Sequence, residues 1–157
     1  MDIGSVRARY AVSWGARSQM YGELTRRRAG VDSERMMTTN DLQAFFGNGW
    51  NRHDLDVLMT FMAEDCVFES TAGPEACGAR HAGRERVRHA FARVFEVFPD
   101  ARFDDARHFV AGNRGVSEWL FTGTTAEGKK VEVNGCDLFT FEGDKIALKS
   151  SYFKTRT

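Results

Sequence analysis

The chain has 157 residues with 22 basic and 22 acidic side chains, and 42% of its residues are hydrophobic. This length and hydrophobic content are sufficient for one folded domain and exclude disorder of the whole chain. A net charge of zero argues against the broad basic surface that a general nucleic-acid binder needs. The chain has no run of about 18 apolar residues, so we expect no transmembrane helix and no membrane partner.

The cysteines and histidines predict neither disulfides nor a metal centre. The cysteines are widely spaced and lack a CxxC pair, which indicates a reducing compartment, so we expect a cytoplasmic protein. They are Cys66, Cys77 and Cys136. The histidines show no metal-ligand spacing, and we expect no metal and no other cofactor. They are His53, His81, His89 and His108.

Residues 1–35 differ in composition from the rest of the chain. They contain seven arginines and four acidic residues, a net charge of +3 that leaves −3 for the remainder. We expect this segment to be a poorly ordered N-terminal extension, with a docked helix as the alternative. Residues 36–157 then form the folded domain.

The first half of this domain carries three helix patterns. Thr39 or Asn40 is expected to cap the first helix, and Asp54 a second, short one. The apolar residues of the first helix follow helical spacing: Leu42, Phe45, Phe46 and Trp50. The third helix has the strongest pattern; it begins at Gly83 and stops at Pro99.

Extended segments make up most of the rest. Short strands are expected at 66–70 and near residues 80 and 81. Longer strands are expected at 102–111, 116–125, 130–141 and 145–154, where the hairpin-type connections GNRG, AEGK and EGDK join them. Helices followed by a run of antiparallel strands predict an α+β fold, with the helices packed on one side of a curved sheet.

Asp137 lies on what is otherwise the apolar face of the strand at 130–141. At a period of two, that face is made by Val131, Val133, Gly135, Asp137, Phe139 and Phe141. A buried charge costs several kcal/mol unless it is paired or protonated, so we expect desolvation to favour the protonated form of Asp137. A structural ion pair produces the same pattern, and a β-bulge at Gly135 would turn Asp137 outward.

Five motifs together resemble a known family. They are WNRHDLDVLMTFMAEDCVFES at 50–70, HAGRERVRHAF at 81–91, FPD at 98–100, SEWLFTGT at 117–124 and GCDLFTFEGDKI at 135–146. In this order and spacing they resemble the nuclear transport factor 2-like superfamily, particularly its SnoaL-like polyketide cyclases and ketosteroid isomerases. The resemblance implies a cone, in which a strongly bent and mostly antiparallel sheet wraps around three helices. It also implies an apolar pocket for a small molecule and a homodimer formed through the outer sheet face.

Only one of the three catalytic positions of the ketosteroid isomerases holds the same residue in this sequence. Asp137 falls at the position of the Asp that stabilises the oxyanion. The position of the proton-moving Asp holds Ser70, and the position of the oxyanion-binding Tyr holds Phe46. A hydroxyl without an adjacent base does not replace a carboxylate as a general base near neutral pH, so a working ketosteroid isomerase is not expected.

Two other residues are candidates for the base. His81 lies before the third helix, near the expected pocket mouth, and an ordinary histidine titrates near neutrality. Glu118 shares a strand face with Val116 and Leu120, although alternation does not decide which face is inside. The expected pocket walls, each equally compatible with plain core packing, are Phe46, Trp50, Phe68, Ser70, Leu120 and Tyr152.

We therefore expect a protein that binds a small hydrophobic molecule, of the polycyclic or carbonyl-containing kind. It would catalyse acid/base chemistry without a cofactor, as an isomerase or lyase that performs isomerisation, dehydration or cyclisation. In this mechanism neutral Asp137 donates a hydrogen bond to the developing oxyanion. The alternative is a non-catalytic ligand-binding or dimeric interaction module, which the loss of two of the three isomerase residues favours.

Overall fold

A computed structural model describes residues 35–156 of the chain. The extension expected over residues 1–35 lies outside the described residues, apart from Arg35. The guanidinium of Arg35 pairs with Asp41 and, at 3.2 Å, with Asp144. These two ion pairs attach the start of the described chain to its first helix and to its last hairpin.

The N-cap of the first helix, α2 (Thr39–Ala44), lies one residue before Thr39, the nearer of the two expected caps. Its N-cap is Thr38, whose Oγ1 accepts a hydrogen bond from the Asp41 backbone N–H at 3.3 Å. In return, Asp41 Oδ2 accepts from the backbone N–H of Thr38 at 2.9 Å. A capping box needs Ser or Thr at the cap and a side-chain acceptor three residues later; Thr38 has Asp41 there, whereas Thr39 has Leu42.

A π-helix, η1 (Phe45–Trp50), continues directly from α2, and its sequence FFGNGW contains two glycines. A Cβ on Gly49 would lie 2.4 Å from Cδ2 of Leu58, so only glycine allows the next helix to pack this closely. That helix, α3 (Leu55–Thr60), is capped by Asp54 as predicted, through a 2.9 Å hydrogen bond from the Val57 backbone N–H.

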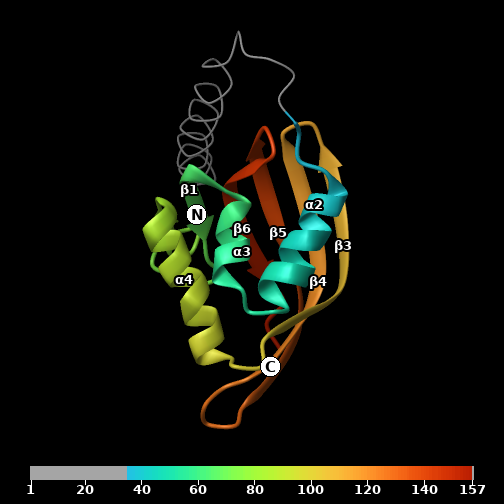
Figure 1. Cartoon of the computed structure of the whole chain (residues 1–157). Helices are drawn as coiled ribbons and strands as arrows, with labels where there is room; N and C mark the ends of the chain where they lie inside the picture. The colour runs from blue at the N-terminus through green and yellow to red at the C-terminus, as the bar shows by residue number, and fades with distance from the viewer. Residues whose placement is uncertain (1–34, 157) are drawn as a thin grey trace, which may run out of the picture. The chain divides into compact units, whose positions relative to one another are not determined.

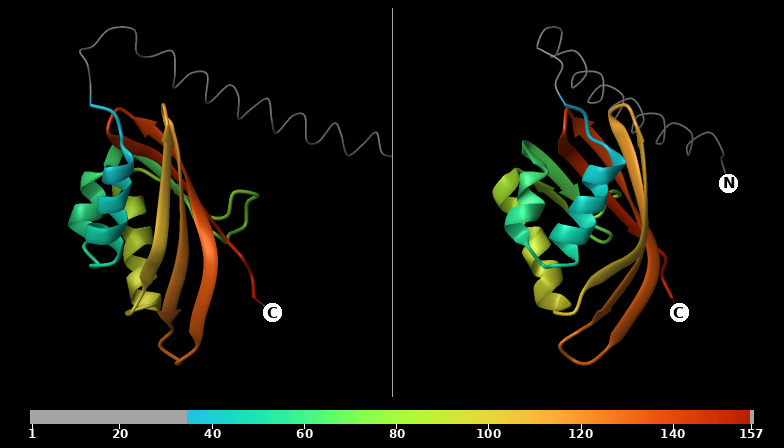
Figure 2. Two further views of the ribbon diagram at one scale, coloured as in Figure 1. Left: turned by 90° about the vertical axis from the view of Figure 1, so that its right-hand side faces the viewer. Right: turned by 45° about the vertical axis from the view of Figure 1, so that its right-hand side comes forward.

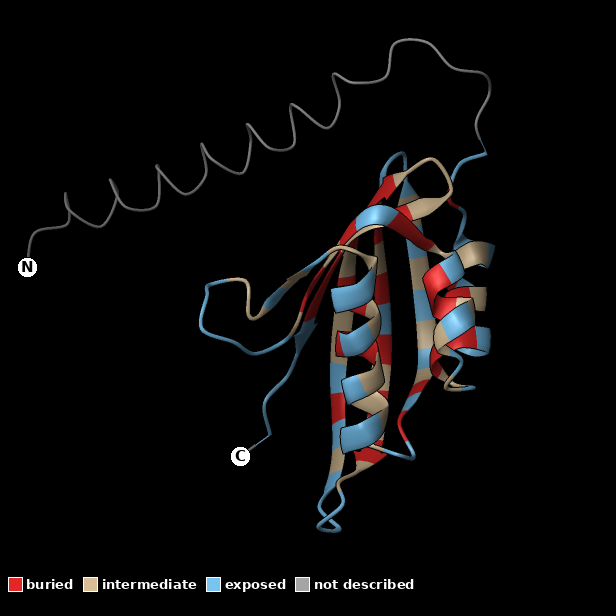
Figure 3. Ribbon diagram, turned by 60° about the vertical axis from the view of Figure 1, so that its left-hand side comes forward, coloured by how far each residue is buried: buried red, intermediate tan, exposed pale blue. Residues whose placement is uncertain are grey.

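The longest helix of the described part of the chain, α4 (Arg84–Val97), follows Gly83, whose φ of +88° suits glycine. It turns Val87, Ala90 and Phe91 into the core and keeps its charged residues outside (Figure 3). No helix within residues 35–156 has the length and hydropathy of a membrane span.

Within residues 35–156, six strands form one curved sheet in the order β2-β1-β6-β5-β4-β3 (Figure 1). They are β1 (Met62–Glu69), β2 (Arg80–Ala82), β3 (Arg102–Ala111), β4 (Arg114–Thr124), β5 (Lys130–Glu142) and β6 (Lys145–Phe153). β1 and β6 pair in parallel, and the other neighbouring strands are antiparallel. β1 begins four residues before the expected strand, because Met62 already pairs with Ile146 of β6.

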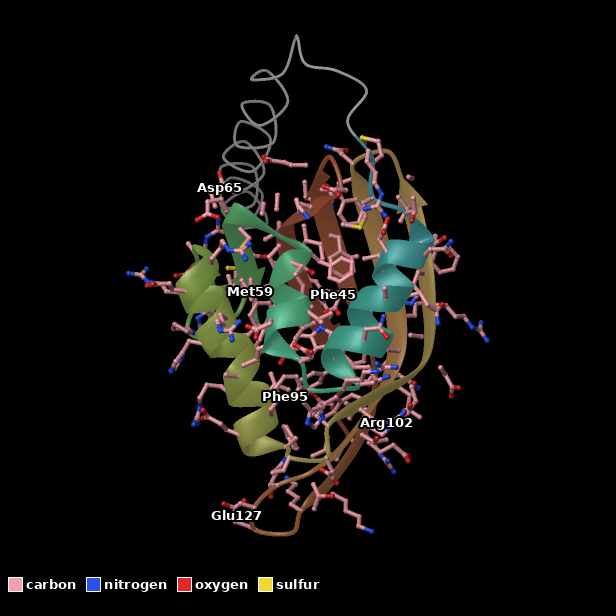
Figure 4. All side chains as sticks on the ribbon, viewed as in Figure 1. Phe45, Met59, Asp65, Phe95, Arg102 and Glu127 are labelled. Atoms are coloured by element: carbon pink, nitrogen blue, oxygen red, sulfur yellow. The ribbon has the colours of Figure 1, made fainter. Side chains whose placement is uncertain are left out.

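The helices labelled α2, α3 and α4 cover the same, concave face of this sheet, as the edge-on view in Figure 2 shows. The expected α+β cone is therefore confirmed. Aromatic side chains fill most of the space between helices and sheet. The side chain of Phe45, on η1, points between α2 and α3 (Figure 4) and contacts Trp50 and Phe139 edge-to-face at 6.3 Å between ring centroids.

One irregularity in β6 determines which of its side chains face the helices. On β5, Thr140 and Phe141 are consecutive, yet they pair with Leu148 and Ile146, so Ala147 is an extra residue. This β-bulge shifts the alternation by one position. Ile146 faces the core before the bulge, and Lys149 faces it afterwards.

Candidate functional site

Asp137 lies at the centre of the concave face and is completely buried. The face predicted for β5 is confirmed, because β4 and β5 pair without interruption from Arg114 to Thr124. Gly135 therefore marks no bulge. A Cβ there would lie 2.3 Å from the indole of Trp119, so glycine provides the room for that ring beside Asp137.

Three side chains donate hydrogen bonds to the Asp137 carboxylate. Lys149 Nζ donates to Oδ1 at 2.7 Å, and the Ser151 hydroxyl donates to the same oxygen. Trp119 Nε1 donates to Oδ2 at 3.0 Å. The charge that looked anomalous in the sequence is therefore half of a buried ion pair with Lys149.

Lys149 is itself 3% exposed, which is rare for a lysine. Its Nζ also contacts the Ser151 hydroxyl at 2.7 Å and lies over the rings of Phe68 and Trp50, at 4.9 and 5.5 Å from their centroids. Burial lowers the pKa of Lys149, while the charge and hydrogen bond of Asp137 act in the opposite direction.

A polar row crosses the concave face through Asp137. Directly paired positions on four neighbouring strands hold His108, Ser117, Asp137 and Ser151. His108 Nδ1 lies 2.8 Å from the Ser117 hydroxyl, and its Nε2 is buried without a hydrogen-bond partner among the described residues. Burial lowers the pKa of His108, so its neutral form is favoured. With Nδ1–H donated to Ser117, Nε2 presents a free lone pair.

The adjacent row holds His81, which the sequence offered as a base. His81 pairs with Phe68 across β2 and β1, and Phe68 pairs with Lys149 across β1 and β6. The imidazole stacks on the Phe68 ring at 5.8 Å. Phe68 thus stands between His81 and the Asp137–Lys149 pair.

The other predicted site residues separate into three groups. Phe46, Trp50 and Phe68 are buried on the concave side. Three others lie on the outer face, beside a hollow of about 630 Å³: Glu118, Leu120 and Tyr152. Ser70 lies in the loop after β1, where its hydroxyl donates to the Ala72 carbonyl at 2.8 Å.

Glu118, offered as a base, lies on the opposite face of the sheet from Asp137. Its neighbour Trp119 reaches Asp137, and the period of two places Glu118 on the opposite side of β4. Tyr152 is 48% exposed because it follows Ser151, which faces inward.

Sequence reasoning missed Lys149, the closest partner of Asp137. Regular alternation from the buried Ile146 assigns Lys149 to the outer face. The bulge at Ala147 reverses that assignment. A signal was nevertheless present, since an unpaired Asp137 on an apolar face requires a nearby donor.

The chain shares its fold with bacterial proteins of known structure. A candidate polyketide cyclase from Xanthomonas campestris pv. campestris is 22% identical, with a TM-score of 0.65 over 74% of this chain and 89% of that one. A second, from Pseudomonas putida KT2440, is 19% identical, with a TM-score of 0.67 over 76% and 92%. An NTF2-like protein of unknown function from Mesorhizobium loti is 31% identical, with a TM-score of 0.60 over 74% and 91%.

No curated protein sequence matches the chain significantly. The SnoaL-like domain family matches residues 42–149, which include η1, α3, α4, the Asp137–Lys149 pair and most of the strands. The chain is therefore a member of the SnoaL-like domain family, within the NTF2-like superfamily.

Proposed function

We propose that the protein binds a small hydrophobic carbonyl compound on the concave face of the sheet and catalyses cofactor-free acid/base chemistry on it. Isomerisation, dehydration and cyclisation all belong to this class, because each begins with proton transfer next to a carbonyl group. The observation that carries the proposal is the buried Asp137–Lys149 pair, at the centre of a face lined by aromatic rings. The similarity to candidate polyketide cyclases supports the same class.

The pair is suited to hold charge on a carbonyl oxygen. A transferable proton lies between Nζ of Lys149 and Oδ1 of Asp137, 2.7 Å apart. Oriented donors in a site without water typically lower a barrier by a few kcal/mol when an oxyanion develops. The pair thus replaces the neutral aspartic acid that the sequence predicted, with Lys149 supplying the proton.

His108 is the base that we propose for the carbon acid. Its Nε2 is buried and unpartnered among the described residues, and its lowered pKa keeps it neutral and able to accept a proton. It lies two strands from Asp137 on the same row, about 10 Å between backbones at the usual strand spacing. A substrate of a few carbon atoms spans such a gap between a donor and a base.

Exchange of α-hydrogens for deuterium tests this proposal without knowledge of the natural substrate. Small apolar ketones are incubated with the protein in D₂O and followed by NMR. We expect the wild type to accelerate exchange for those ketones that bind, and Asp137→Asn and His108→Phe to abolish the acceleration. Glu118→Gln, on the outer face, is the matched control and retains it. If Glu118→Gln and Asp137→Asn lost the acceleration of exchange equally, the Asp137–Lys149 pair would not be the site of proton transfer.

A non-catalytic binding module is the second candidate. The three donors to Asp137 leave its carboxylate well satisfied, as in a structural ion pair. This candidate predicts ketone binding, measurable by quenching of tryptophan fluorescence, without any acceleration of exchange.

We also propose that the outer face forms a homodimer of a cytoplasmic protein. Phe109 and Tyr152 are 57% and 48% exposed on that face, which supports a partner surface there. All three cysteines are free, in keeping with a reducing compartment. Light scattering of the wild type and of Tyr152→Glu tests the dimer, which the introduced charge should dissociate.

A further inference from the structure

We infer that Lys149 is a nucleophile that forms an imine with an aldehyde or ketone bound on the concave face. This inference rests on the proposed function, since it needs a carbonyl compound at that site. It adds a covalent step, which acid/base chemistry alone does not require.

The position of the Lys149 amine favours its reaction with a carbonyl group. Lys149 is 3% exposed, and two of its contacts, with Asp137 Oδ1 and the Ser151 hydroxyl, are hydrogen bonds of 2.7 Å. Its Nζ also lies over the rings of Phe68 and Trp50. An amine needs such apolar surroundings to be reactive near neutral pH, because they disfavour the ammonium form.

The Asp137 carboxylate can accept the proton that Lys149 must lose before it reacts. Transfer of one proton from Nζ to Oδ1 converts the buried ion pair into a neutral amine and a carboxylic acid without changing the total charge. Burial disfavours both charges of an ion pair, so it favours the neutral pair relative to its balance in water. Lys145, on the same strand, is 45% exposed; its Nζ donates to the Thr60 carbonyl, and the nearest carboxylate oxygen, of Asp144, lies 3.9 Å away.

The amine of Lys149 and the carboxyl group of Asp137 together complete the reaction. The Lys149 lone pair attacks the carbonyl carbon, the carbonyl electron pair moves to oxygen, and Asp137 protonates that oxygen to give a carbinolamine. The nitrogen then returns a proton to Asp137, which passes it to the hydroxyl group. Water leaves as the nitrogen lone pair forms the C=N bond. The products are a protonated imine, an Asp137 carboxylate and one water, so atoms and charge balance without an oxidant or reductant.

Trp50 supplies an independent indication that a polar ligand atom belongs here. Its side chain is 1% exposed, its ring is 5.5 Å from Lys149 Nζ, and its Nε1 has no hydrogen-bond partner among the described residues. A buried indole N–H normally finds an acceptor. The oxygen of a bound carbonyl compound or carbinolamine provides that acceptor.

Reductive trapping tests the imine. The full-length protein is incubated at neutral pH with the apolar ketone 4-phenyl-2-butanone and sodium cyanoborohydride, which reduces an imine to a stable amine. Intact mass and peptide mapping then locate the adduct, whose mass gain is that of the ketone less its oxygen. Lys145→Met is the matched control for Lys149→Met, and the alcohol 4-phenyl-2-butanol is the control for the carbonyl group.

We expect one adduct, at Lys149, in the wild type and in Lys145→Met, and its loss in Lys149→Met and with the alcohol. Mapping of the wild type gives the answer even if Lys149→Met does not fold. Ketone binding without an adduct at Lys149, or labelling spread evenly over the exposed lysines, would overturn the imine while leaving the proposed function intact. Absence of ketone binding, measured by tryptophan fluorescence, would overturn both.

Discussion

Replacement of Lys149 by methionine removes the ammonium group but keeps most of the side-chain volume. At 2.7 Å and an effective dielectric constant of about 20, the attraction between Lys149 and Asp137 amounts to about 6 kcal/mol. Burial of the two charges costs several kcal/mol for each, so the net contribution of the intact pair is small. Removal of one partner leaves Asp137 charged and buried, and we expect Lys149→Met to cost about 3–5 kcal/mol of unfolding free energy.

A double-mutant cycle isolates the interaction from the other losses. Asp137→Asn alone leaves Lys149 without its counter-charge and is also strongly destabilising. The double variant removes both charges, so we expect it to be about 2–3 kcal/mol more stable than the sum of the two single costs predicts. Urea unfolding is followed by tryptophan fluorescence, since Trp50 and Trp119 both contact the pair.

The exposed Lys145 provides the control for this cycle. Lys145→Met should cost less than about 1 kcal/mol, as expected for a surface charge. An unchanged urea dependence in all variants supports comparison of their free energies. If the free-energy costs of the two single variants added up to that of the double variant, Lys149 and Asp137 would not be coupled. If Lys149→Met cost no more unfolding free energy than Lys145→Met, the pair would not behave as a buried one.

Three other changes test separate features of the structure. Gly135→Ala places a Cβ 2.3 Å from the Trp119 ring and 2.4 Å from the Tyr152 carbonyl oxygen, so overpacking should cost about 1–3 kcal/mol in thermal unfolding; an unchanged melting temperature would show that the ring does not need this space. The folded-state pKa of His108 lies below its ordinary value of 6.5, so the unfolded chain binds the proton more readily. The stabilisation from neutral His108 is therefore fully present above about pH 6.5 and is lost as pH falls from there toward the folded-state pKa. Urea titrations across this range should show a smaller loss in His108→Phe, and equal losses in both proteins would contradict the assignment. Thr38→Ala removes the α2 cap and should cost about 1 kcal/mol in urea unfolding, whereas alanine at the neighbouring Thr39 should have little effect.

The sequence predicted those features that depend on local pattern. The apolar periodicity of β5 placed Asp137 inside, and Asp54 and Gly83 marked the starts of two helices. The strand limits after residue 100 were close to those observed, because hairpin turns separate the strands clearly. These signals lie within a few residues of one another, so they need no knowledge of the tertiary structure.

The missed features depend on contacts between distant segments. The bulge at Ala147 lies where β6 pairs with β5 on one side and in parallel with β1 on the other. No local sequence pattern predicts it. The sequence of the π-helix that contains Trp50 does not distinguish it from an α-helix. The face of Glu118 was undecidable, because both faces of β4 carry apolar residues.

The bulge in β6 determines the charge at the centre of the cone. If β6 kept Ala147 but paired regularly with β5, Lys149 and Ser151 would face outward, and Leu148 and Ser150 would take their places. Deletion of Ala147 would remove only the extra residue, so Lys149 would keep its place opposite Phe139 and Ser151 its place opposite Asp137. The polar centre of the cone therefore depends on how this strand accommodates one extra residue, and not on the side chain of that residue.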